Sequence, residues 1–270
     1  MSHLLREHAP ITAAAWSVVD EEARSRLRPA LAARRLVDFR GPHGWEHSAL
    51  NLGRVEPVDP GPLGDGVQGR RRRVLALAEL RAPFTLDREE LRAADRGAED
   101  PALDPLDDAA RRLALAENAA VFHGWPDAGI TGIVPASPHT PVRCGDDTER
   151  YACHVAHAVE LLLGQGVGGP YGLALGGDEY ARVIQTAEHG GYPLFDHLAK
   201  ILAGGPIVWA PGLHDAVVLS LRGGDFLFEC GEDIGVGYDD HDAGTVALYL
   251  EESFTFLNAA PEAAVPIVTG

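Results

Sequence analysis

The feature that most constrains this chain is a long stretch that cannot form part of a core. From Asn51 to Arg73 the sequence shows no sustained periodicity, and it ends in four consecutive arginines. Its breakers are Pro57, Pro60, Gly61, Pro62, Gly64, Gly66 and Gly69. Loops of this length are uncommon inside compact domains. We therefore expect this segment to serve a purpose outside its own subunit.

The arginine run from Arg70 to Arg73 permits two interpretations. It could form a nucleic-acid patch, or it could be a solvated or inter-subunit face that meets carboxylates of a neighbour. The chain carries 40 acidic against 23 basic residues, a formal charge of -17. Because such a charge repels phosphates and acidic membrane surfaces, the second interpretation is favoured, and neither nucleic acid nor membrane is an expected partner.

The segment before the arginine-rich stretch predicts a sharp corner. An apolar run from Leu36 breaks at Arg40-Gly41-Pro42, resumes with Trp45 and continues to Val55. We interpret it as a junction between a helix and an extended arm, without catalytic residues.

Length and composition predict a sizeable core and a cytoplasmic protein. The chain has 270 residues, of which 46% are hydrophobic, enough for one large or two modest domains. Neither a signal-peptide core nor a run of about 18 apolar residues appears. The three cysteines are far apart and odd in number, so we interpret them as small buried hydrophobes rather than a disulfide framework.

Local signals predict an α+β fold. Thr12 is a plausible N-cap for a helix that ends near Pro29, and a long helix should begin at Asp104, as its N-cap, with Gly124 just past its end. A strand is expected over Val74 to Leu86, with Pro83 marking an edge, and an α/β unit over residues 147–221. We also expect Arg222 to Asp225 to be a hairpin turn, followed by further strands to Phe256.

No stretch of sequence identifies an active site or a metal site. Cys153, His154 and His157 share a predicted helix but lack a third ligand nearby, and His43 with His47 has no carboxylate pair close in sequence. Asp239 to Asp242 lacks the spacing and the glycine of a calcium loop and is expected to be a solvated surface. The glycines from Gly164 to Gly169 follow a helix and precede a strand, the reverse of a nucleotide-binding loop.

Seven groups of segments resemble, in order and at matching spacing, those of encapsulin shell proteins (family 1 encapsulins, also called the linocin-like bacteriocin family). They are HLLREHAPIT, VDFRGPHGWEHSA, AELRAPFTLD, FHGWPDAGITGI, GPYGLAL, HGGYPL, and LRGGDF with GEDIGVGYDD and EESFTF. The resemblance covers nearly the whole chain, from about Leu4 to Phe256 and on toward its end.

The resemblance implies the major capsid protein fold of tailed bacteriophages, the Hong Kong 97 type. It divides the chain into an N-terminal helix and the start of a peripheral domain (1–48), an extended loop (49–73), the peripheral domain with its long helix (74–134), an axial domain (135–220) and return strands of the peripheral domain (221–270). It also implies self-assembly into an icosahedral cage of about 60 subunits (T=1), without catalysis by the shell itself.

The resemblance further implies that the shell encloses a cargo enzyme, either ferritin-like and iron-storing or of the peroxidase type, whose C-terminal targeting peptide binds a groove inside. Carried over by motif, the groove residues are Leu31, Arg34, Asp38, Asp233, Ile234, Val236 and Tyr238. The implied lining of the five-fold pore is Glu188, His189, Gly190, Gly191 and Tyr192. No flavin is expected, because Arg88 and Glu89 stand where flavin-binding members carry a tryptophan.

Two alternative functions are considered besides that of a shell subunit. One is a free-standing hydrolase or bacteriocin-like protein. The other is a prophage capsid protein that packages nucleic acid, against which the charge of -17 argues.

Overall fold

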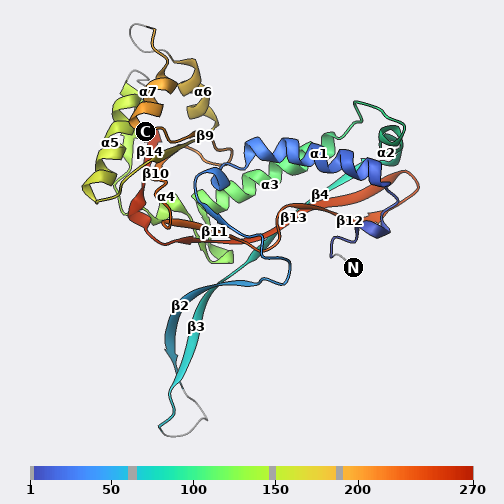
Figure 1. The fold of residues 1–270 in the computed structure, drawn as a ribbon, viewed down its shortest axis with the longest axis horizontal. Coiled ribbons are helices and arrows are strands. Elements are labelled where there is room, and N and C mark those ends of the chain that lie inside the picture. Colours follow the sequence, from blue (N-terminus) through green and yellow to red (C-terminus); the bar gives the residue numbers. More distant parts are fainter. Residues whose placement is uncertain (1–2, 60–65, 146–149, 187–190, 270) are drawn as a thin grey trace.

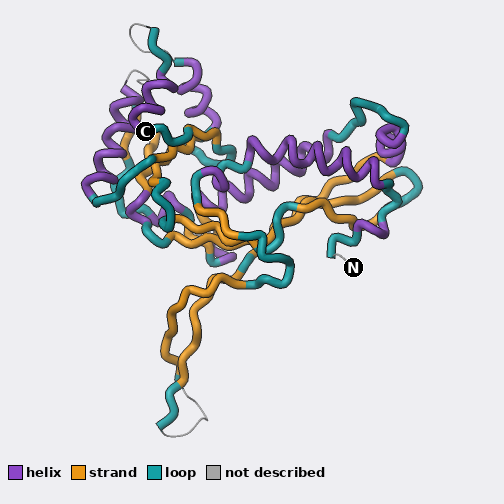
Figure 2. Tube along the Cα trace, viewed as in Figure 1, coloured by secondary structure: helices purple, strands orange, loops and turns teal. Residues whose placement is uncertain are grey.

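The computed structural model describes residues 3–59, 66–145, 150–186 and 191–269, which form two β-sheets with helices packed on each and one projecting arm (Figures 1 and 2). The prediction of an α+β fold is confirmed. Among the described residues, no helix combines the length and apolar character needed to cross a lipid bilayer.

The first sheet is organised around one long strand, β13, which pairs with three others. Its members are β1 (Asp38–Arg40), β4 (Ala78–Asp87), β11 (Phe226–Cys230), β12 (Gly235–His241) and β13 (Thr245–Asn258). β4 runs antiparallel to β13 over ten residue pairs and has no other partner in the sheet, which agrees with the edge position inferred from Pro83. Asp242 accepts hydrogen bonds from the backbone of Gly244 and Thr245 and closes the turn between β12 and β13. Asp239 to Asp242 are all exposed, as expected for a solvated surface.

Three helices accompany the first sheet: α1 (Ala13–Ala30), α2 (Arg88–Asp95) and α3 (Asp104–Phe122). Figure 1 shows α1 and α3 side by side along one face of this sheet. The Thr12 hydroxyl caps α1 by accepting from the Ala15 N–H at 3.2 Å, as predicted. α3 begins at Asp104, one residue earlier than predicted, so its N-cap is Leu103 rather than Asp104. Apolar side chains of α1, α3, β4, β12 and β13 form one of two hydrophobic cores.

The second sheet has the strand order β7-β14-β10-β8-β9. Its strands are β7 (Val142–Cys144), β8 (Tyr171–Leu175), β9 (Ile207–Trp209), β10 (Ala216–Ser220) and β14 (Ala264–Thr269). The helices beside it are α5 (Tyr151–Gly164), α6 (Gly177–Gln185) and α7 (Leu194–Ile201). Between the two sheets, the chain forms a small ribbon of β5 (Gly124–Trp125) and β6 (Ile130–Thr131), followed by α4 (Ile133–Ala136). The second core includes this sheet and the phenylalanines of β11 and β13.

Two predictions about the last third of the chain are wrong. Arg222 to Asp225 is a turn, but not of a hairpin, because β10 and β11 belong to different sheets. The final strand, β14, also does not return to the first sheet with the rest of 221–270. It pairs antiparallel with β10 and parallel with β7. In both cases the buried strands pair with segments that are distant in the sequence and not with the strand expected from local signals.

The arm is an antiparallel ribbon rather than an irregular loop. β2 (Ala49–Val58) pairs with β3 (Gly69–Ala76), so the segment expected to end at residue 73 continues in regular structure to Ala76. A register shift between Asn51 and Arg54 accommodates Gly53, whose φ is +65° and whose N–H donates to Asn51 Oδ1. The ribbon projects away from both sheets (Figure 1).

None of the three cysteines forms a disulfide, but only two match the expectation of burial. Cys144 and Cys230 are buried, whereas Cys153 is exposed on α5.

Candidate functional site

A groove of about 460 Å³ lies between α1 and the start of β12. Its apolar lining comes from Ala23, Leu27, Leu31, Ile234, Val236 and Leu250. Its charged lining comes from Arg6, Arg24, Arg28, Arg34, Asp20 and Asp233. Such a combination, apolar pockets edged by fixed charges, suits an extended peptide that carries aliphatic anchors.

Five of the seven predicted groove residues line this groove together. Leu31, Arg34, Asp233, Ile234 and Val236 converge there from segments about 200 residues apart in sequence. Leu31 and Ile234 are half-buried, and Val236 is only 3% exposed.

The other two predicted groove residues lie elsewhere. Asp38 borders a separate cavity of about 170 Å³, where its Oδ2 accepts from the Gly224 N–H at 2.5 Å. Tyr238 is 8% exposed and belongs to the core beneath the groove, with its hydroxyl 2.5 Å from His241 Nδ1. Both side chains therefore stabilise local structure in this chain and do not line the groove.

Arg34 ties the groove to the core through three ion pairs. Its guanidinium lies 2.7 Å from Glu117 of α3, 2.7 Å from Glu252 of β13 and 2.6 Å from Asp233. The side chains of Glu117 and Glu252 are fully buried, whereas that of Asp233 is 48% exposed. The network thus fixes the position of Arg34 and leaves one carboxylate, that of Asp233, accessible from the groove.

Burial and charge oppose each other in this network. Burial raises the pKa of Glu117 and of Glu252, and the two carboxyls compete for one guanidinium. Burial alone would lower the pKa of Arg34, but the carboxylates of Glu117, Glu252 and Asp233 outweigh it and the net shift is upward. Arg34 therefore stays cationic and acts as a permanent anchor beneath the groove.

Sequence reasoning missed the contribution of α1 to the groove. The local signals predicted a helix that ends near Pro29, but they did not identify Ala23, Arg24, Leu27 and Arg28 as groove residues. The signal was present in the spacing, because residues 20, 24, 27, 28 and 31 recur at intervals of three and four and share one side of a helix. This spacing indicates a groove only when the position of β12 beside that face of α1 is known.

The predicted pore residues lie in the loop between α6 and α7. Glu188, His189 and Gly190 fall outside the described residues. Gly191 has a φ of +78°, and the exposed Tyr192 ring lies 4.9 Å from the Lys200 ammonium. Whether these residues line a pore is a property of an assembly and stays a prediction.

The two groups of candidate metal ligands noted in the sequence differ in the structure. Cys153, His154 and His157 share α5, and within the described ranges they belong to no group of three ligand atoms that lie within 4.8 Å of one another. His43 and His47 lie in the corner between β1 and β2, and Glu229 of β11, which is distant in sequence, lies within 3.2 Å of both rings.

The fold matches that of capsid-type shell proteins. A virus-like particle protein from Pyrococcus furiosus superimposes with a TM-score of 0.59 at 17% identity, covering 92% of this chain and 98% of that one. The capsid of a native GTA particle superimposes with a TM-score of 0.54 at 16% identity, covering 90% and 91%. The chain therefore has the tailed-phage capsid fold, the Hong Kong 97 type, and the expected fold class is confirmed.

The family follows from sequence similarity. A family model described as an encapsulating protein for peroxidase matches residues 1–255. The type 1 encapsulin shell protein of Rhodospirillum rubrum is 46% identical over 271 residues, which covers 99% of this chain and 96% of that protein. The chain belongs to the type 1 encapsulin shell protein family, as the resemblance of its motifs predicted.

Proposed function

We propose that this chain self-assembles into a closed icosahedral shell of about 60 subunits (T=1) that encloses a cargo enzyme in the cytoplasm. The shell itself is assigned no catalysis. The first sheet with α1 to α3 corresponds to the peripheral domain, and the second sheet with α5 to α7 to the axial domain. Family membership and the capsid-type fold support the proposal of a shell.

The observation that most directly supports self-assembly is the exposed arm. A two-stranded ribbon is only marginally stable by itself in water. The ribbon exposes Val55 and Val74 by 54% and 49%, and all four arginines of β3 are exposed. Within the arm, Arg71 pairs with Glu56. A neighbouring subunit that covers the valines and supplies carboxylates to the arginines would stabilise the arm.

Assembly is tested by electron microscopy and sedimentation of the purified chain. Closed particles of one size are expected, with an absorbance spectrum typical of protein without nucleic acid. A monomer or dimer at all concentrations would refute the shell. Particles filled with nucleic acid would instead support the prophage capsid alternative.

The groove is the proposed binding site for the C-terminal targeting peptide of the cargo. Leu27, Leu31 and Ile234 offer apolar surface to aliphatic anchors of the peptide. Four arginines line the same groove. Of these, Arg24 pairs with Glu21 on the exposed side of the helix, and Arg28 is exposed without an ion pair among the described residues. These cations favour a peptide with a carboxylate beside its apolar residues.

The nature of the cargo is proposed from the resemblance alone. A ferritin-like, iron-storing enzyme or a peroxidase fits, and the second is consistent with the description of the matching family. Reading the genes next to this one for an enzyme with a short apolar C-terminal extension would identify it.

Cargo binding is tested by fusing such an extension to a fluorescent protein and co-expressing it with the shell. Leu31→Asp and Ile234→Asp place a charge against the anchors and should reduce the fluorescence that co-purifies with particles by at least about tenfold. Leu31→Met keeps the volume and should load normally. Equal loading of all three variants would show that the peptide binds elsewhere.

A further inference from the structure

The corner between β1 and β2 is fastened to the end of β11 by backbone hydrogen bonds. The His43 N–H donates to the Cys230 carbonyl at 3.1 Å, and the Gly44 N–H donates to the Gly231 carbonyl at 2.7 Å. Gly41 has a φ of +114°, and a side chain there would collide with the Cys230 carbonyl. The corner therefore sits close against β11, and its histidines are held over that strand.

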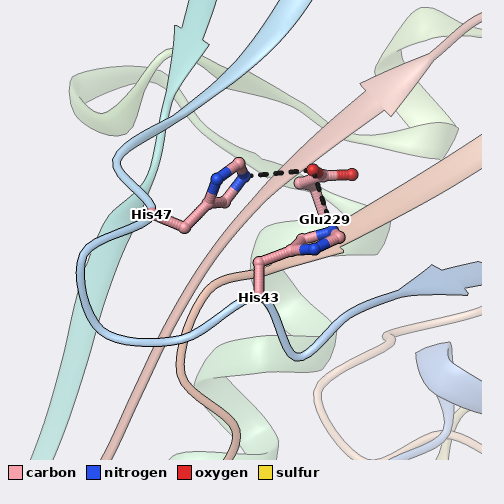
Figure 3. Close-up of side chains that lie close together, drawn as sticks. All are labelled: His43, His47 and Glu229. Carbon is pink, nitrogen blue, oxygen red and sulfur yellow. Dashed lines mark hydrogen bonds and ion pairs between the residues drawn. The ribbon is translucent and has the colours of Figure 1, made fainter.

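The side chains of His43 and His47 converge on one carboxylate (Figure 3). His43 Nε2 lies 3.2 Å and His47 Nε2 3.0 Å from the same oxygen, Oε1 of Glu229. The Glu229 side chain is 7% exposed, while the two histidine side chains are 43% and 28% exposed. Within the described ranges, no other group of three histidine, cysteine or acidic side chains brings its ligand atoms within 4.8 Å of one another.

The spacing of these atoms fits the coordination sphere of a transition metal ion. Tetrahedral bonds of about 2.0–2.1 Å place neighbouring ligand atoms about 3.3 Å apart. The observed separations of 3.0 and 3.2 Å between nitrogen and oxygen are close to that value. Imidazole nitrogens suit zinc and its neighbours in the first transition series, whereas calcium and magnesium prefer oxygen ligands throughout.

We propose that His43, His47 and Glu229 bind a divalent transition metal ion such as Zn²⁺. The two imidazoles and the carboxylate supply three ligands, and the exposed side of the rings leaves a fourth position for water. On metal binding, the Glu229 carboxylate and the Nε2 lone pairs of both imidazoles would share the cation.

The position of the site gives it a structural role. β2 begins at Ala49, two residues after His47, and the Leu77 N–H at the other root of the arm donates to the Ser48 carbonyl. A metal ion that joins the corner to β11 would restrain the root of both arm strands. Metal occupancy would thereby fix the direction in which the arm leaves the body.

The test is titration of the full-length chain, freed of metal by a chelator, with Zn²⁺ alone by calorimetry, and with Co²⁺ by visible absorption. One equivalent per chain is expected, with the intense absorption of tetrahedral Co²⁺. Glu229→Gln and His47→Asn should weaken binding by at least about 100-fold. His157→Ala is the matched control, since it removes another exposed histidine that pairs with a glutamate, Glu160 at 3.2 Å, and it should bind normally.

Three results would overturn the metal site: no saturable binding, binding unchanged in Glu229→Gln and His47→Asn, or an equal loss in His157→Ala. His43→Asn changes the most exposed ligand and provides a second route if the buried substitution prevents folding. The metal site does not rest on the proposed function. Particles that form without binding Zn²⁺ refute only the metal site, and a chain that binds Zn²⁺ without forming particles refutes only the shell.

Discussion

Replacing Arg34 with methionine should destabilise the fold strongly, because it leaves two fully buried carboxyls without their cation. Arg34 is 15% exposed, and Glu117 and Glu252 are 0% exposed. Removing one partner of a buried ion pair costs about 3–5 kcal/mol, and the half-exposed Asp233 adds nothing to this figure because water solvates it. For a chain of this size, the melting temperature should fall by roughly 10 °C at about pH 8.

The loss of stability in Arg34→Met should shrink as the pH is lowered. Burial already raises the pKa of Glu117 and Glu252 above the ordinary value of 4.5, and removing the cation raises both further. A carboxyl whose pKa is higher in the folded state binds more protons when folded. The free energy of unfolding therefore increases as the pH falls from the raised pKa toward 4.5, and it increases more in the variant than in the parent.

Thermal unfolding followed by circular dichroism at about pH 8 and about pH 5.5 measures both effects. Protein concentration must be matched, because assembly adds a concentration-dependent stabilisation. A triple variant, Arg34→Met with Glu117→Leu and Glu252→Leu, removes the uncompensated charges and should recover most of the lost stability. A melting temperature within about 2 °C of the parent at both pH values, or a loss that grows toward low pH, would refute the reasoning.

Three further predictions concern packing, thiol chemistry and assembly. Asn118→Ala removes hydrogen bonds to three backbone groups and should lower the free energy of unfolding by about 3 kcal/mol, measured by urea denaturation; a change below about 1 kcal/mol would contradict it. Burial raises the pKa of the Cys230 thiol to about 12, so a thiol reagent at neutral pH should label the exposed Cys153 first, and fast labelling that persists in Cys153→Ser would disprove this. Val55→Asp should leave the circular dichroism spectrum unchanged but prevent particle formation in sedimentation, whereas Val55→Ile should assemble; normal particles from Val55→Asp would rule out an arm contact there.

Replacing Asp38 with alanine separates the motif-based assignment from the geometry. Carried over by motif, Asp38 is a cargo contact, but its carboxylate holds the Gly224 N–H outside the groove. We expect Asp38→Ala to load the fluorescent fusion as well as the parent does. If the particles formed normally but loading was lost, Asp38 would be a contact of the targeting peptide after all.

Features that depend on neighbouring residues were determined by the sequence alone. Thr12 caps α1 and Gly124 follows the end of α3 with a φ of +94°, because caps and helix ends depend on side chains and dihedral angles within one turn. The arm between β1 and β4 was likewise recognisable, since a segment so rich in breakers cannot enter a core. The motifs, in their order along the chain, identified the family, and the family implied the fold.

Only the tertiary structure decided which distant segments meet. Arg222 to Asp225 carries the local signals of a hairpin, yet β10 and β11 part into two sheets because each strand buries both faces among residues from elsewhere in the chain. Arg34 reaches Glu252 across 218 residues, and His47 reaches Glu229 across 182. No local pattern encodes such encounters, because they depend on how sheets and helices pack. The groove and the histidine corner are therefore properties of the folded chain.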